Sequence, residues 1–131
     1  MELQNLLRME PLIIESGGDT PYVNFNPGTN TFLIAEKSLP ANAVEFYEPV
    51  FAWITQYLKD PNENTFFDFK LDYFNTSSSK QIARFFKFIA DSPFKERVSV
   101  RWFYEEDDSD MLDSGLLYAK LIDINFEFIE Y

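Results

Sequence analysis

Four consecutive hydroxyl side chains, Thr76, Ser77, Ser78 and Ser79, follow Asn75 near the middle of the chain. Hydroxyl and amide oxygens can cap a helix, because they accept hydrogen bonds from the N–H groups that a first turn leaves unpaired. The same N–H groups and the helix dipole favour negative charge, so a phosphate is also tolerated there. The cluster is therefore a candidate helix cap and a candidate phosphorylation site. The local residues by themselves favour the cap.

A second group that could do chemistry is acidic. It lies between positions 105 and 113 and comprises Glu105, Glu106, Asp107, Asp108, Asp110 and Asp113. Carboxylates bind hard cations, but the spacing does not match an EF-hand loop, which needs a glycine and a terminal glutamate at set positions. Two interpretations stay open. The run is a solvated loop, or its carboxylates hold Mg²⁺ weakly in a small metal-dependent enzyme.

Basic residues form a third group. Six of the eleven lysines and arginines lie between positions 80 and 101, and Lys80, Arg84 and Lys87 recur there at helical spacing. Such a face is usually a solvated surface. Because the acidic run follows directly, the surface is polarised in a way that suits docking to other proteins.

The composition excludes several classes of function. The chain has 131 residues, neither histidine nor cysteine, and a net charge of −11. This charge repels nucleic acid and anionic membranes, and the missing side chains remove the commonest general base and all thiol chemistry. The chain contains no P-loop, no G-x-G-x-x-G and no nucleophile elbow, so we expect no cofactor. The N-terminus is unlike a signal peptide and no apolar run is long enough to span a bilayer, so we expect a cytoplasmic protein.

Alternating and helical periodicities predict the elements that position these groups. The predicted strands are 11–15, 22–25, 31–35, 65–73, 98–104 and 124–129, and the predicted helices are one after Pro40, one over 78–90 and a short one over 111–121. We therefore expect an α/β fold of one domain over residues 1–131, with a mixed sheet of six strands, two main helices and a short third. Residues 1–9 are expected to be a loose lead-in.

Two details of this prediction bear on the hydroxyl cluster. In strand 65–73, alternation places Phe67, Phe69, Leu71 and Tyr73 on one side. Ser78 and Gln81 have the spacing of a capping box, which begins the helix at Ser78 and leaves Thr76 outside its first turn.

The order strand, helix, strand over 65–104 predicts that strands 65–73 and 98–104 are parallel. Both then end at the same edge of the sheet, which is where open α/β sheets hold their functional sites. We therefore expect the hydroxyl cluster and the acidic run to lie at one edge.

Several stretches of the chain occur in the same order in a known family. They are Thr20–Phe25, Ser38–Ala43, Phe46–Val50, Tyr73–Lys80, Val100–Glu105, Asp107-Asp108 and Asp110-Met111. On these residues the chain resembles the SiaC-type regulatory phosphoproteins of bacteria over positions 10 to 128. Among the departures, Glu36 stands where the family tends to have glycine, and Leu116-Leu117 stands where acidic residues are frequent.

The resemblance implies a STAS-like, non-enzymatic α/β protein, similar in logic to anti-sigma-factor antagonists. It implies phosphorylation of Thr76 by a dedicated protein kinase and removal of the phosphate by a PP2C-type phosphatase. The unphosphorylated form would bind an output partner, in the family a diguanylate cyclase that it activates, and phosphate would break that contact. We expect the surroundings of the phosphosite and the partner surface to consist of Asn75, Ser77, Ser78, Ser79, Lys80, Arg84, Glu105, Asp107, Asp108 and Asp110. The alternatives are the metal-dependent enzyme and an unmodified scaffold.

Overall fold

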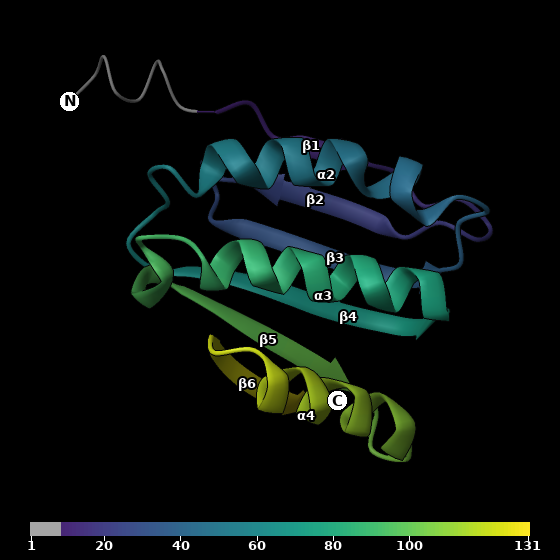
Figure 1. Ribbon diagram of the computed structural model, residues 1–131. Helices are drawn as coiled ribbons and strands as arrows, with labels where there is room; N and C mark the ends of the chain where they lie inside the picture. The colour runs from purple at the N-terminus through teal and green to yellow at the C-terminus, as the bar shows by residue number, and fades with distance from the viewer. Residues whose placement is uncertain (1–8) are drawn as a thin grey trace.

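The computed structural model describes residues 9–131, which form a six-stranded sheet with helices packed on it (Figure 1). The strands are β1 (Leu12–Ile14), β2 (Tyr22–Asn26), β3 (Thr31–Ser38), β4 (Thr65–Phe74), β5 (Val98–Tyr104) and β6 (Asn125–Glu130). The helices are α2 (Ala43–Tyr57), α3 (Thr76–Ala90) and α4 (Ser109–Leu121), with a short 3-10 turn, η1 (Lys95–Arg97). The predicted α/β class and mixed six-stranded sheet are confirmed. The expected lead-in falls almost wholly on residues 1–8, outside the described residues, and Met9 is partly buried against the core.

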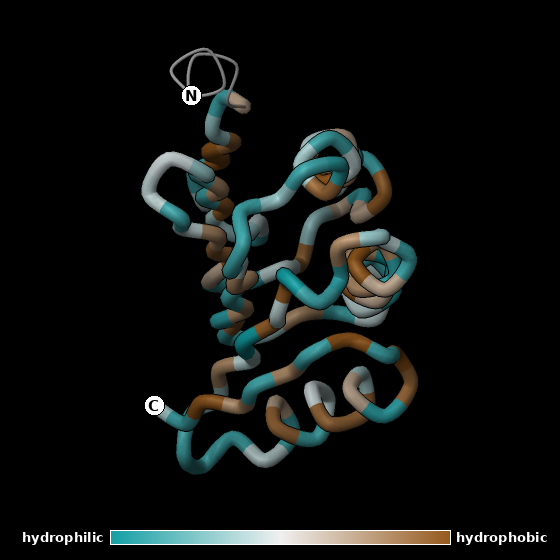
Figure 2. Tube along the Cα trace, turned by 90° about the vertical axis from the view of Figure 1, so that its left-hand side faces the viewer, coloured by the Kyte–Doolittle hydropathy of each residue, from teal (hydrophilic) through white to brown (hydrophobic). Residues whose placement is uncertain are grey.

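The strand order in the sheet follows the order in the chain, from β1 to β6. β1, β2 and β3 are antiparallel neighbours, whereas β3, β4, β5 and β6 are parallel. Each parallel pair is joined through one helix. Because right-handed crossovers that advance in one direction place every helix on the same face, α2, α3 and α4 all cover one side of the sheet (Figure 2). The predicted parallel pairing of β4 and β5 is confirmed.

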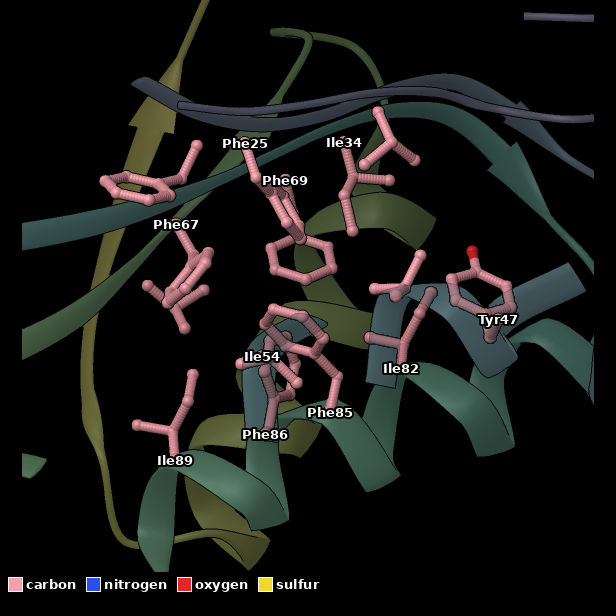
Figure 3. Close-up of a cluster of buried hydrophobic side chains, with 14 of the residues drawn as sticks. Phe25, Ile34, Tyr47, Ile54, Phe67, Phe69, Ile82, Phe85, Phe86 and Ile89 are labelled. Atoms are coloured by element: carbon pink, nitrogen blue, oxygen red, sulfur yellow. The ribbon is translucent and has the colours of Figure 1, made fainter. Parts of the chain in front are cut away.

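The core lies between the sheet and its three helices. The strands contribute the inward residues of the alternating pattern, such as Phe25 and Phe67, and the helices contribute residues such as Ile54 and Phe85 (Figure 3). The rings of Phe67 and Phe85 meet edge to face with centroids 5.1 Å apart, an arrangement that aromatic quadrupoles favour. Dense aromatic packing of this kind holds α3 against the sheet.

A bulge lies near the ends of β3 and β4. Glu36 pairs with Leu71, but Lys37 pairs with Tyr73, so β4 carries one extra residue at this point. The inward alternation therefore breaks after Leu71, and Tyr73 is 57% exposed. The prediction that Tyr73 shares the buried side of the strand is wrong for this reason.

Both long helices begin at an asparagine. Asn42 accepts a hydrogen bond from the Glu45 N–H at 3.1 Å, so α2 starts directly after it, at Ala43, three residues beyond Pro40. Asn75 accepts from the Ser78 N–H at 2.9 Å, so α3 starts at Thr76. The predicted start at Ser78 is wrong, because the amide side chain of Asn75 satisfies the first turn three residues earlier.

The far face of the sheet carries paired charges and aromatic rings. Arg101 donates two hydrogen bonds to the carboxylate of Asp68, at 2.6 and 2.8 Å, and its guanidinium lies 4.7 Å from the Phe66 ring centroid. The pKa of Arg101 is raised mainly by this hydrogen bond. The Arg101 side chain is therefore occupied by contacts within the fold. Over residues 9–131, no helix is both long and apolar enough to cross a membrane.

Candidate functional site

The carboxyl edge of the parallel strands holds the hydroxyl cluster. β4 ends at Phe74 and α3 begins two residues later at Thr76. β5 lies beside β4 in the same direction and ends at Tyr104, after which the acidic run leads into α4. In Figure 1 the arrowheads of β4 and β5 both point to the right, where α3 and α4 begin. The predicted placement of both groups at one edge is confirmed.

Three of the four hydroxyls at the start of α3 are engaged in hydrogen bonds. Ser77 Oγ donates to Asn75 Oδ1 at 3.1 Å, and Ser79 Oγ donates to the Thr76 carbonyl at 2.7 Å. Ser78 is fully buried, and its hydroxyl donates to the Ser38 carbonyl at 2.9 Å. These serines therefore serve the local structure of the helix start.

Thr76 differs from the three serines. Its side chain is exposed, and its hydroxyl makes no hydrogen bond with any other residue of the described chain, 9–131. It occupies the first helical position, where the backbone N–H has no partner within the helix. A group attached to Thr76 Oγ1 would therefore extend into solvent beside unpaired N–H groups and the positive end of the helix dipole.

A buried chain of hydroxyls supports this helix start from beneath. Ser38 Oγ donates to Ser78 Oγ at 2.8 Å and lies 2.7 Å from Tyr47 Oη. A serine hydroxyl has one hydrogen, so Tyr47 is the donor in its contact with Ser38. Burial raises the pKa of Tyr47 to about 12, against the smaller opposing effect of the Ser38 hydrogen bond. The Ser38 carbonyl also accepts from the Asn75 N–H at 3.2 Å, so the end of β3 anchors the start of α3.

The basic residues of α3 lie in different settings. Lys80, one turn after Thr76, is exposed on the surface of the helix. The guanidinium of Arg84 lies 4.4 Å from the Phe51 ring centroid, on α2, and 5.7 Å from that of Phe88. Because residues at i and i+4 share one helix face, Lys80 is the basic residue next to Thr76. Arg84 lies one turn further along the helix, and its guanidinium packs on the Phe51 ring of α2.

The acidic run divides into a structural and an exposed part. Asp108 caps α4, since its Oδ1 accepts from the Met111 N–H at 3.0 Å. Glu105, Glu106 and Asp107 are exposed and line a shallow polar hollow with Tyr131. Within residues 9–131, no three acidic side chains are grouped closely enough to hold a metal ion. The metal-dependent enzyme therefore has no geometric support in this part of the chain.

α3 and α4 are in direct contact beside the site. Tyr118 Oη donates to the Ser79 carbonyl at 2.8 Å, and burial raises the pKa of Tyr118. The Tyr118 ring also meets Phe86 edge to face at 5.2 Å. α3 and α4 are thereby joined beside the site by a hydrogen bond and an aromatic contact.

Comparison with known proteins agrees with the sequence pattern. The sequence model of the SiaC family regulatory phosphoproteins matches residues 14–131, nearly the whole chain. The chain belongs to the SiaC family of regulatory phosphoproteins. No curated protein matches it significantly.

Solved structures share the fold of this SiaC-family chain. SiaC of Pseudomonas aeruginosa is 22% identical with a TM-score of 0.82, and the match covers 94% of this chain and 100% of that one. A structure of diguanylate cyclase SiaD in complex with its activator SiaC from the same organism matches at 22% identity and a TM-score of 0.83, over 92% of this chain and 99% of that one. At this identity the likeness establishes the fold.

Three residues of the site are not identified by the sequence patterns. Tyr73 lies exposed beside the helix start, and Ser38 and Tyr47 lie beneath it. An isolated Ser38 at the end of a strand gives no local signal of its contact with Ser78. Tyr73 could have been found only by anticipating the bulge that turns it outward.

Proposed function

We propose that this chain is a non-enzymatic signalling protein of the cytoplasm, switched by reversible phosphorylation of Thr76. The observation that carries the proposal is the state of the four hydroxyls: the serines are engaged in hydrogen bonds, and Thr76 is exposed without one. A protein kinase would transfer a phosphoryl group to Thr76 Oγ1, and a PP2C-type phosphatase would return the free hydroxyl by hydrolysis. Membership of a family of regulatory phosphoproteins supports this assignment.

The unphosphorylated form binds an output partner through the surface around Thr76, in this proposal. SiaC in the similar complex is described as an activator of the diguanylate cyclase SiaD, so a diguanylate cyclase is the proposed partner class. Tyr73 offers an exposed aromatic ring two residues before Asn75, the residue that caps α3. Tyrosine is enriched among the residues that anchor protein interfaces. The rim is supplied by Lys80, by the exposed acids Glu105, Glu106 and Asp107, and by Asp110 in the first turn of α4.

Phosphate at Thr76 would oppose this contact in two ways. It adds about two negative charges at pH 7, which would have to be desolvated at the interface, and it adds bulk at a packed contact. The helix start itself tolerates the phosphate because of the unpaired N–H groups. The switch therefore changes the surface without unfolding α3.

The test compares Thr76→Ala and Thr76→Asp with wild type in pull-downs read by mass spectrometry, followed by affinity measurement with the captured partner. We expect Thr76→Ala to bind as well as unphosphorylated wild type and Thr76→Asp to bind much more weakly. Ser77→Ala and Ser77→Asp are the matched controls at a neighbouring exposed hydroxyl. The proposal fails if both Thr76 variants bind like wild type and peptide mapping from cells finds no phosphate on Thr76, which would favour an unmodified scaffold.

A further inference from the structure

The outer face of α4 carries an unusual concentration of exposed apolar side chains. Leu116, Leu117 and Leu121 are 47%, 56% and 70% exposed. Seven large apolar residues are exposed among residues 9–131, and these three lie within six positions of one helix. Apolar stretches are visible along α4, the lowest helix in Figure 2. Grouped exposure of this kind marks an interaction surface more often than single exposed leucines do.

These leucines are not needed to hold α4 on the sheet. The inner face of the helix is formed by other residues: Gly115 packs on Trp102, whose indole N–H donates to the Met111 carbonyl at 2.9 Å. Tyr118 completes the attachment through its contact with α3. A helix that is apolar on both its inner and its outer face is normally covered on both.

The charge around these leucines indicates what would cover them. Positions 105 to 123 contain seven acidic residues and one basic residue, Lys120. Asp123 is paired with Lys95 at 3.1 Å, and Asp108 caps the helix. Asp110 and Asp113 remain exposed on the first half of α4, next to the leucines of its second half. An acidic rim of this kind complements a basic partner.

We propose that the outer face of α4 is a docking surface for an amphipathic helical segment of another protein, with an apolar row and lysine or arginine flanks. Its apolar row would pack on Leu116, Leu117 and Leu121, and its basic residues would meet Asp110 and Asp113. A second copy of this chain is disfavoured as the occupant, because pairing α4 with α4 would bring two acidic rims together. The leucines of this surface lie apart from the contact proposed around Thr76, and the two surfaces share only Asp110.

The test uses the full chain and a short, fluorescently labelled synthetic peptide of leucine and lysine at amphipathic helical spacing. Two matched peptides replace lysine by glutamate, or leucine by serine. We expect only the leucine–lysine peptide to bind with saturation, and hydrogen exchange to show protection on α4. Binding should weaken about tenfold in the double variant Leu117→Gln/Leu121→Gln, while Val44→Gln, at an apolar residue of α2 that is 59% exposed, should bind like wild type.

Three results would overturn the proposal. One is equal binding of the leucine–lysine peptide to the double variant, with both proteins shown to be folded by circular dichroism. Another is equal binding of the serine–lysine peptide, which would indicate charge attraction alone. The last is a wild-type dimer in sedimentation that becomes a monomer in the double variant, which would identify a second copy as the occupant.

Discussion

Ser78 and Thr76 are two positions apart, yet they have opposite roles. Ser78 is buried and exchanges hydrogen bonds with the hydroxyl and carbonyl of Ser38, whereas Thr76 is exposed. A modifying enzyme reaches an exposed hydroxyl far more readily than a buried one. At the scale of residues, burial therefore determines which of several similar hydroxyl side chains a modifying enzyme can reach.

The first prediction concerns Ser78. Ser78→Ala should lower the free energy of unfolding by about 1–3 kcal/mol, because it leaves the buried Ser38 hydroxyl without its acceptor. Ser77→Ala, at an exposed neighbour, should change it by less than about 0.5 kcal/mol. Chemical denaturation of the two variants checks this. Equal effects would show that the buried hydroxyls do not stabilise the helix start.

The second prediction concerns Glu36, whose φ of 75° lies in the left-handed region that glycine adopts without strain. Glu36→Gly should raise the free energy of unfolding by on the order of 0.5–1 kcal/mol, because relief of strain exceeds the added chain entropy of glycine. Lys37→Gly is the matched control, because Lys37 has no positive φ. This substitution should lower the free energy of unfolding of the protein. Denaturant midpoints of the two variants should move in opposite directions.

At the scale of elements, α4 is held on β5 by a close approach. A Cβ added at Gly115 would lie 2.4 Å from Trp102 Cδ1, well inside van der Waals contact. Trp102 is fully buried and also donates to the Met111 carbonyl, so it has little room to move. The glycine is therefore a packing requirement of the α4–β5 contact.

The third prediction follows from this contact. Gly115→Ala should destabilise the fold by about 1–3 kcal/mol and increase hydrogen exchange in α4, because overpacking separates the helix from Trp102. Gly18→Ala, where an added Cβ meets no atom within 4 Å, is the control and should have little effect. A Gly115→Ala variant as stable as wild type would show that α4 can shift freely on the sheet.

At the scale of the whole molecule, the buried Tyr47 joins α2 to the sheet, and the partly buried Tyr118 joins α4 to α3. Burial raises the pKa of Tyr47 to about 12 and raises that of Tyr118 as well. The neutral phenol is the form that the folded state favours. The free energy that the neutral phenol of Tyr47 contributes to folding is therefore fully present below pH 10, the ordinary pKa of tyrosine. It is lost as the pH rises toward 12.

The fourth prediction is an alkaline loss of stability. Between pH 10 and pH 12, Tyr47 should contribute a decrease in the free energy of unfolding on the order of 2–3 kcal/mol. Tyr47→Phe should be less stable at neutral pH, since Ser38 Oγ loses a donor, but should show a shallower alkaline decline. Tyr73→Phe, at an exposed ring, is the control. Equal alkaline slopes for wild type and Tyr47→Phe would contradict the prediction.

The sequence by itself determined the elements of this protein and the type of residues at its site. Period-two and period-3.6 patterns are local properties, so they predicted six strands and three helices, and the order strand, helix, strand then predicted the parallel pairing of β4 with β5. The same local logic placed the hydroxyls and the acids at one edge of the sheet. It also identified Asn75 and Thr76 as members of the cluster, although it assigned the helix start to Ser78.

Only the tertiary structure decided which hydroxyl is free and which surfaces are exposed. Ser78 is buried because Ser38, forty positions away, lies beneath it, and Tyr73 is exposed because a bulge shifts the register of β4 against β3. The leucines of α4 face outward because Trp102 receives Gly115 on the opposite side of the helix. In each case the cause is a contact between segments distant in the chain, which no local pattern records.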